Sequence, residues 1–355
     1  MNRRDILKAG LAGGAAALTG MYALPKKAFA KKPDFKFKLQ SFLGPGWLEW
    51  EELVPRYCER VKLMSGGRIE IRPYPPGALV ATFDMIDGVG RGVVEMAYGA
   101  QCYWKGVFPY TIWAWAVPFA FDVVEQHDYL WQEAGLLEIS REQFATKNIH
   151  FLGPIYSDEW GATMSTKPIK TLEDYKGLKI RSFGVVAEIW KSFGAGIARL
   201  PGEELYTGLS TGVIDGVNWG SPYGFVATKL DEVAKYYCGP SLIDFDTEDV
   251  FMNMGVYKSL PPDLQECMNM ATRIFALERA TISTYQSCLA VGKMKAAGVQ
   301  FSSLPESDIA KMKKLSDEII RDQANSDPVS KKVVDLVMKT SETISQRPRM
   351  VRKLD

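Results

Sequence analysis

The chain has 355 residues, of which 46% are hydrophobic and 24% are charged. This length predicts about two domains with a sizeable core, and the composition excludes a disordered or fibrous protein. The formal net charge is +1, and no basic block suited to a phosphate backbone occurs, which argues against nucleic acid as a partner. The five cysteines are scattered and lack CxxC spacing, so neither a disulfide framework nor a zinc or haem site is expected.

Residues 1–30 are typical of a removable export signal. Arg3 and Arg4 precede an uncharged, Gly- and Ala-rich stretch, and Ala28-Phe29-Ala30 has the small-x-small pattern of a cleavage site. A retained anchor helix is the alternative, but the stretch is shorter than the ~20 residues that a membrane span requires. We expect twin-arginine export, cleavage after Ala30 and a periplasmic protein. Because many proteins exported this way carry redox cofactors, a periplasmic enzyme with a bound cofactor is the alternative function.

The mature chain alternates predicted strands and helices. Period-two alternation predicts strands at 35–40 and 68–72, and helical spacing of apolar residues predicts a helix at 47–64. A short helix at 83–90 and a strand at 93–98 follow. Such alternation predicts an α/β fold of largely parallel sheets covered by helices, with ligands bound beyond the carboxyl ends of the strands.

A short motif occurs twice in the chain. Gly92-Val93-Val94-Glu95-Met96 recurs as Gly212-Val213-Ile214-Asp215-Gly216, each time after a predicted helix. A chance match is the alternative, but two related units predict two lobes with a ligand cleft between them. The expected boundaries are lobe 1 at 31–152 with a returning segment at about 237–262, and lobe 2 at 153–236 with C-terminal segments at about 297–355.

Residues 263–291 contain neither Gly nor Pro and carry apolar side chains at helical spacing. A helix of this length spans roughly 40 Å at 1.5 Å per residue, which exceeds one lobe. We therefore expect a spine helix at 263–296 that runs along both lobes. Helices predicted at 306–325 and about 327–345 complete the chain and are expected to serve packing.

Catalytic motifs are sparse. His127 and His150 are the only histidines, which gives little support to a histidine metal site or a Ser-His-Asp triad. Phosphate-loop, HExxH and GxSxG motifs do not occur. The enzyme alternative therefore has the export signal in its favour and no cofactor motif.

Arg181 is the strongest candidate for ligand binding. Gly177 is placed to turn the chain into a strand at 178–181, and Gly184 precedes the next predicted helix. Arg181 then lies at the carboxyl end of an interior strand, beside the expected cleft. A permanently charged guanidinium in that place calls for an anion, and a carboxylate can satisfy it bidentately. An internal ion pair with an Asp or Glu is the alternative.

Four segments together make the chain similar to a known family: 172–181, Phe193-Gly194-Ala195, Glu204-Leu205-Tyr206 and Gly212–Gly216. They resemble the solute-binding proteins of tripartite ATP-independent periplasmic (TRAP) transporters, the DctP family, and the resemblance covers essentially the whole mature chain. It implies a two-lobed periplasmic-binding-protein-like fold with mixed sheets flanked by helices, which closes around its ligand by a hinge. It also implies that Arg181 binds a substrate carboxylate and that a membrane permease receives the ligand.

The segment Asn218-Trp219-Gly220-Ser221-Pro222-Tyr223 resembles the Glu-Trp-x-Gly-Pro segment of the branch that binds 2-oxo acids or lactate. In that branch the Glu and Trp help to hold a metal ion and the substrate. Asn218 replaces the Glu and removes a negative charge, so a Na⁺ or Ca²⁺ ion is expected to bind weakly or to be absent. Asn218 is expected to contact the substrate by a hydrogen bond or through such a weakened metal contact. The resemblance further implies cleft positions for Glu159 or Trp160 and a metal carboxylate at Asp244.

Aromatic side chains are expected to form the apolar walls of the cleft. Trp219 belongs to the segment just described, and Tyr103 and Trp104 follow a first-lobe strand at its carboxyl end. For Asp244, Asp246, Glu248 and Asp249 a solvated acidic loop is the alternative to a metal site. The resulting prediction is a non-enzymatic binding protein for a small organic acid, most simply a 2-oxo or 2-hydroxy monocarboxylate. A ligand-sensing partner of a membrane receptor remains open.

Overall fold

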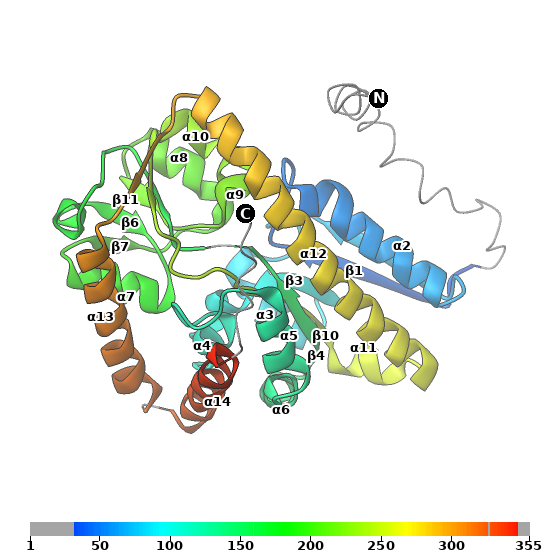
Figure 1. Ribbon diagram of the computed structural model, residues 1–355. Coiled ribbons are helices and arrows are strands. Elements are labelled where there is room, and N and C mark those ends of the chain that lie inside the picture. The colour runs from blue at the N-terminus through cyan, green and yellow to red at the C-terminus, as the bar shows by residue number, and fades with distance from the viewer. Residues whose placement is uncertain (1–31, 159, 326, 347–355) are drawn as a thin grey trace, which may run out of the picture.

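The computed structural model describes residues 32–158, 160–325 and 327–346. The signal segment 1–30 and its expected cleavage site lie outside these residues. Two mixed sheets flanked by helices form two lobes, which Figure 1 shows side by side with a single long helix crossing both. The predicted fold class is confirmed.

Lobe 1 is built on a five-stranded sheet in the order β2-β1-β3-β10-β4. β1 pairs in parallel with β2 and β3, whereas β10 is antiparallel to β3 and β4. The strands are β1 (Phe35–Ser41), β2 (Ile69–Tyr74), β3 (Met96–Ala100), β4 (Ile149–Tyr156) and β10 (Thr247–Asn253). The helices are η1 (Glu49–Leu53), α2 (Val54–Met64), η2 (Thr82–Asp84), α3 (Met85–Gly90), η3 (Gln101–Trp104), α4 (Thr111–Trp115), α5 (Val124–Gln132), α6 (Leu136–Ala145) and α11 (Met254–Ser259).

Lobe 2 is built on a six-stranded sheet in the order β11-β9-β5-β8-β6-β7. β6 pairs in parallel with β7 and β8, and β5 is antiparallel to β8 and β9. The strands are β5 (Thr163–Ser165), β6 (Lys179–Arg181), β7 (Gly196–Ala198), β8 (Gly216–Val217), β9 (Tyr236–Gly239) and β11 (Gln300–Ser303). The helices are η4 (Leu172–Tyr175), α7 (Gly184–Ser192), η5 (Gly202–Glu204), α8 (Leu205–Ser210), α9 (Pro222–Ala227), α10 (Leu230–Val233) and α13 (Glu306–Ala324).

The repeated motif occupies equivalent places in the two lobes. It links α3 to β3 in lobe 1 and α8 to β8 in lobe 2, and each of these strands pairs in parallel with the strand that starts its unit. The strand predicted at 93–98 begins only at Met96. Gly92 has a φ of +75° and the Val93 N–H donates to the Gly88 carbonyl at 2.9 Å, so these residues form a turn that delays the strand.

Two segments connect the lobes: one contains residues 157–158 and 160–162, and the other is 240–246. They pair with each other through Trp160 and Ile243, whose backbone N–H groups and carbonyls exchange hydrogen bonds of 2.7 and 3.0 Å. The chain was expected to return to lobe 1 at about 237, but β9 lies in the second sheet between β11 and β5, and the first-sheet strand is β10. The last helix, α14 (Pro328–Ser345), contacts α4 and α5 of lobe 1 as well as α13, instead of belonging to lobe 2 alone as expected.

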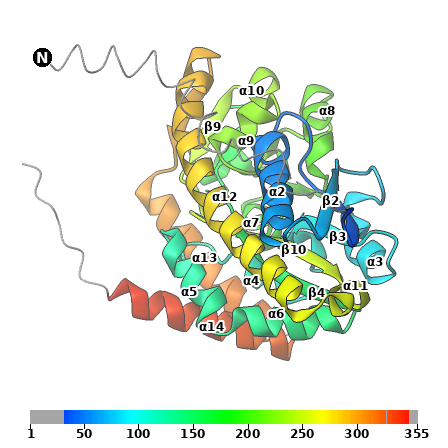
Figure 2. The ribbon, with the colours of Figure 1, turned by 90° about the vertical axis from the view of Figure 1, so that its right-hand side faces the viewer.

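Helix α12 (Pro262–Ala296) is the predicted spine. It contacts α2 and β4 of lobe 1 and α9 of lobe 2, and Figures 1 and 2 show it lying across the whole molecule. At 1.5 Å per residue its 35 residues extend about 52 Å. Across the described residues, no helix combines the length and the apolar character that a membrane span needs.

Candidate functional site: a cavity between the lobes

A cavity of about 40 Å³ lies between the two lobes. This is room for roughly three water molecules at 10–15 Å³ each, so only a small ligand fits this closed arrangement. Six aromatic rings line it: Phe42, Trp47, Tyr103, Trp115, Trp160 and Trp219. Five charged side chains line it as well: Asp158, Arg181, Asp246, Glu248 and Arg279.

Arg181 is held at the carboxyl end of β6, as predicted. Its Nε donates to the Leu200 carbonyl at 3.0 Å, Nη1 donates to the Asn218 carbonyl at 3.2 Å, and Nη2 donates to the Tyr103 hydroxyl at 3.4 Å. Its side chain lies over the Phe183 ring, with 4.4 Å between Cζ and the ring centroid. These contacts fix the plane of the guanidinium and leave one N–H on each terminal nitrogen for a ligand.

Arg181 forms no ion pair within the described part of the chain, although the nearby charge of Glu203 favours its charged form. The residue is only 1% exposed, and no described carboxylate lies within 4.0 Å of its nitrogens. Burial lowers the pKa of Arg181, and Tyr103 partly offsets this effect. A buried guanidinium with free donors and no ionic partner is suited to bind an anion.

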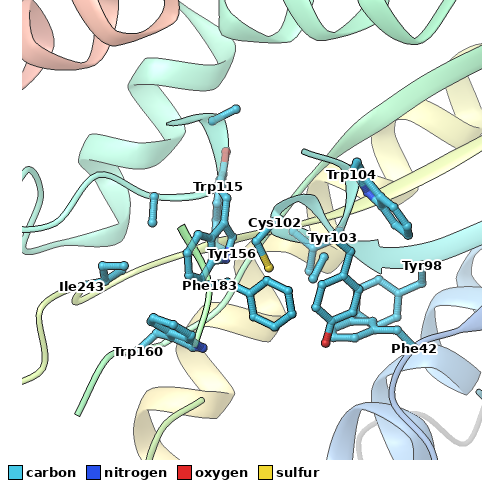
Figure 3. Packing of buried hydrophobic residues seen from close by; sticks show 14 of the residues in the cluster. Phe42, Tyr98, Cys102, Tyr103, Trp104, Trp115, Tyr156, Trp160, Phe183 and Ile243 are labelled. Carbon is cyan, nitrogen blue, oxygen red and sulfur yellow. The ribbon is translucent and has the colours of Figure 1, made fainter. Parts of the chain in front are cut away.

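The aromatic walls come from both lobes. Figure 3 shows Trp115 and Trp160 on one side of Phe183 and Tyr103 and Phe42 on the other. The Trp115 and Trp160 rings meet edge to face with centroids 4.6 Å apart, and the Tyr103 and Phe183 centroids are 5.4 Å apart. The rings shield the charged groups from water and give the ligand apolar surfaces. Trp104, also expected in the wall, instead packs in the core, where its Nε1 donates to Asp249.

Trp219 lies in the wall of the cavity, next to Arg181, where the sequence placed it. Its ring centroid is 5.8 Å from the Arg181 Cζ and 5.1 Å from the Trp47 centroid. A Cβ atom at Gly202 would lie 2.3 Å from the Trp219 ring, so only glycine leaves room for the tryptophan here. Trp219 therefore joins the two lobes through Trp47 and also covers the guanidinium.

Asn218 serves the fold. Its Nδ2 donates to the carbonyls of Gly161 and Ala162 and to the Thr163 hydroxyl at 2.8–3.2 Å. The side chain is fully buried and is not part of the cavity lining. Its Oδ1 has no hydrogen-bond partner among the described residues. Asn218 thus anchors one of the two connecting segments, while its own carbonyl orients Arg181.

The predicted metal ligands do not form a common site. Asp244 is exposed and outside the cavity lining, and the Asn218 amide is committed to the backbone. Within the described ranges, no group of three or more His, Cys, Asp or Glu side chains is arranged to hold a metal ion. Trp160 does line the cavity, whereas Glu159, the other candidate, lies outside the described residues. Asn218 and Asp244, the metal ligands that the resemblance implied, therefore do not line the cavity.

A buried charge cluster beside the cavity was not predicted. We call it the Arg279 cluster; it contains Arg279 of α12 with Glu49, Asp158 and Glu248. The Arg279 nitrogens lie 3.0 Å from Glu49, 3.8 Å from Asp158 and 3.2 Å from Glu248. These carboxylates raise the pKa of Arg279 well above its ordinary range. Burial raises the pKa of Glu49 to about 7, partly offset by Arg279.

Asp246 lies near this cluster but has no ionic partner among the described residues. Its Oδ2 accepts a hydrogen bond from Trp115 Nε1 at 3.1 Å, and its Oδ1 has no hydrogen-bond partner. Burial, and next the nearby charge of Glu248, raises the pKa of Asp246 well above its ordinary value. Asp246, Glu248 and Asp249 are all buried, so the solvated-loop interpretation is wrong for them and holds only for Asp244.

One sequence signal could have indicated Arg279. It follows Ala271 and Phe275 at spacings of eight and four, which places it on the buried face of the spine helix. A charge on such a face must be paired. No comparable signal identifies its partners, because Glu49, Asp158 and Glu248 come from three distant segments. Trp115 likewise carries no such signal, because Asp246, which accepts the hydrogen bond of its indole, lies 131 residues away in the sequence.

Comparison with known proteins agrees with this architecture. Residues 48–327 match the model of the family "Bacterial extracellular solute-binding protein, family 7" (DctP), and residues 1–20 match a twin-arginine translocation signal. The signal and the family together make this a periplasmic protein exported by the twin-arginine route. A "Monocarboxylate 2-oxoacid-binding periplasmic protein" of Nostoc sp. is 27% identical over 344 residues, which cover 94% of this chain and 92% of that protein.

Two solved structures share the fold. A TRAP solute-binding protein from Colwellia psychrerythraea, with bound calcium and pyruvate, is 26% identical with a TM-score of 0.80, covering 88% of this chain and 96% of that one. A second, from Bordetella bronchiseptica with calcium and picolinate, is 22% identical with a TM-score of 0.82, covering 88% and 94%. The family match, the two-lobed fold and the cavity together identify this chain as a member of family 7 of the bacterial extracellular solute-binding proteins, the DctP receptors of TRAP transporters.

Proposed function

We propose that this protein captures a short monocarboxylic acid between its lobes and delivers it, chemically unchanged, to the membrane permease of a TRAP transporter. The observation that carries the proposal is Arg181, which is buried, fixed by three hydrogen bonds and without an ionic partner among the described residues. A ligand carboxylate supplies that partner. Each charge-assisted hydrogen bond to such a group contributes about 1.5–3 kcal/mol.

Lobe closure follows from where the contacts lie. Arg181 belongs to lobe 2, whereas Tyr103 and Trp47 belong to lobe 1. A carboxylate on Arg181 is therefore enclosed only when the lobes meet, so the ligand stabilises the closed form by its differential affinity for it. The closed form is then the state that the permease distinguishes from the empty receptor.

The class of acid stays a prediction. The small cavity favours a short chain. The similarity to a receptor named for monocarboxylate 2-oxo acids and to a pyruvate-bound structure supports a 2-oxo or 2-hydroxy acid. That structure also holds calcium, and an ion bound with the acid here would need ligands other than Asn218 and Asp244, which do not line the cavity. The family match gives no support to an exported cofactor enzyme, and a sensing role would use the same cavity.

The decisive experiment measures binding of short acids by calorimetry to the exported protein, after unfolding and refolding have removed bound ligand. Arg181→Lys should weaken carboxylate binding at least about 100-fold, because about 3 kcal/mol of bidentate contact is lost. Arg199→Ala is the matched control, because this exposed arginine also lies over the Phe183 ring. The Arg199→Ala variant should bind the acids with the same affinity as the wild type. Equal affinities for the Arg181→Lys variant and the wild type would refute the proposal.

A further inference from the structure

We infer that the ligand is a small zwitterion: its carboxylate binds Arg181, and a cationic nitrogen close to that carboxylate contacts Asp246 within the aromatic wall. This inference rests on the proposed function for the carboxylate and concerns what else the ligand carries. An amino acid or an N-methylated amino acid has this chemistry. Sequence resemblance favours an oxo or hydroxy group at that place, whereas the charges of the cavity favour an amino group.

The first argument is charge balance. Two guanidinium groups, Arg181 and Arg279, face the carboxylates of Asp158, Asp246 and Glu248 around the cavity, and Glu49 lies directly behind them on Arg279. Arg279 pairs with Asp158 and Glu248, and the ligand carboxylate pairs with Arg181, which leaves Asp246 as the carboxyl group of the described wall without a cationic partner. A simple carboxylate satisfies Arg181 alone and leaves Asp246 buried without a cation, which is costly. A zwitterion brings no net charge.

The second argument is the unused hydrogen-bond acceptor of Asp246. The other cavity carboxylates are occupied: Glu248 accepts from Arg279 and Tyr98, and Asp158 accepts from Ser287. Asp246 is only 6% exposed, yet its Oδ1 has no donor among the described residues. Buried carboxylate oxygens are almost always hydrogen-bonded in folded proteins. An ammonium group in the cavity would supply the donor and the opposite charge together.

The third argument is the aromatic wall, which is independent of the carboxylates. The faces of aromatic rings attract cations, and most strongly those of tryptophan. Four of the six rings that line the cavity are tryptophans, and Trp115 is also the residue that donates to Asp246. Trp160 meets Trp115 edge to face. The Asp246 carboxyl group and the tryptophan pair thus lie together in the wall of the cavity.

A bound metal ion fits this corner less well than a nitrogen cation. Ca²⁺ takes six to eight oxygen ligands, but Asp246 offers a single unused carboxylate oxygen, and the described chain contains no metal-binding group of three acidic, His or Cys side chains. One strong acceptor beside aromatic faces is the arrangement that an ammonium group needs.

The test compares acids that differ only in the 2-substituent: alanine, lactate and pyruvate, followed by 2-aminobutyrate and 2-hydroxybutyrate. Calorimetry on the ligand-free exported protein should give at least tenfold tighter binding for each amino acid than for its hydroxy or oxo partner. Equal or tighter binding of lactate or pyruvate would overturn the inference and leave the proposed function intact. Binding of none of the acids would refute the proposed function itself.

Two matched variants test whether Asp246 causes the preference for amino acids over hydroxy acids. Asp246→Asn keeps the acceptor for Trp115 but removes the charge, and it should reduce the preference for amino acids at least tenfold while lactate binds no more weakly. Asp249→Asn, three residues further along in β10 and hydrogen-bonded to Trp104 outside the cavity lining, should leave the preference unchanged. An unchanged preference in a folded Asp246→Asn protein would contradict the inference. The inference would also be contradicted if lactate bound as tightly as alanine once Ca²⁺ was added.

Discussion

Arg181 in lobe 2 donates a hydrogen bond to the hydroxyl of Tyr103 in lobe 1, with 3.4 Å between Nη2 and the hydroxyl oxygen. The contact joins the lobes at the group that we expect to bind the ligand. Both side chains are nearly fully buried, and burial raises the pKa of Tyr103 to about 12, so the phenol stays protonated at neutral pH. Carboxylate binding and lobe closure therefore share one polar contact.

Removing this hydroxyl should weaken ligand binding without affecting the fold. Tyr103→Phe keeps the edge-to-face contacts with Phe42 and Phe83 and loses one hydrogen bond, which corresponds to about 0.5–1.5 kcal/mol. We expect affinity for the best acid to fall roughly 2- to 12-fold, with an unchanged melting temperature of the ligand-free protein. Tighter binding by the variant would show that the hydroxyl opposes closure.

A second contact between the lobes should control how long the ligand stays bound. The Thr82 hydroxyl of η2 donates to Glu203 of η5 at 2.8 Å. Thr82→Val removes it, and dissociation should accelerate roughly 2- to 12-fold, since interface changes act mainly on the dissociation rate. Stopped-flow fluorescence of the cavity tryptophans measures this rate. Thr211→Val, which removes a hydroxyl bonded only within lobe 2, is the control and should leave the rate unchanged.

The buried carboxyl of Asp249 should make stability depend on pH. Burial raises its pKa from 3.8 to about 8. The folded state therefore holds a proton that the unfolded state releases above pH 3.8, so this group's contribution to stability falls as pH rises from about 4 to 8.

Asp249→Asn removes that dependence while keeping an acceptor for the Trp104 indole. Its free energy of unfolding relative to the wild type should increase by roughly 3–5 kcal/mol between pH 4.5 and pH 8.5. Chemical denaturation at several pH values measures the difference. Asp317→Asn, at an exposed site on α13, should show a constant difference from the wild type, and a constant difference for Asp249→Asn would refute the pKa assignment.

Ligand binding should not need a metal ion. Asn218 is neutral and tied to the backbone, and Asp244 is exposed, so Ca²⁺ or Na⁺ should change the affinity for the best acid by no more than about twofold. Calorimetry in EDTA, in Ca²⁺ and in Na⁺ tests this directly. A tenfold gain in Ca²⁺ would show that groups other than those described complete a metal site.

Much of the fold followed from local patterns in the sequence. Apolar periodicity located β1, α2 and the spine helix within a few residues, because burial on one face imposes that period on each element separately. The position of Arg181 at a strand end was predicted for the same reason: Gly177 precedes a short strand that pairs in parallel with its neighbours, and its carboxyl end reaches the cavity. The predicted element boundaries were wrong where backbone hydrogen bonds, and not apolar periodicity, set the start of an element. The turn at Gly92, which delays the start of β3 to Met96, is an example.

The sequence by itself determined the export signal, the two α/β units, the spine and the one cation at the end of an interior strand. Only the tertiary structure decided what surrounds that cation. Asp246 and Glu248 lie in an acidic stretch that would be solvated in isolation, and they become buried because the second connection enters the middle of the first sheet as β10. Arg279 then meets carboxylates from three distant segments. Such pairing depends on how the lobes dock, and no local period encodes it.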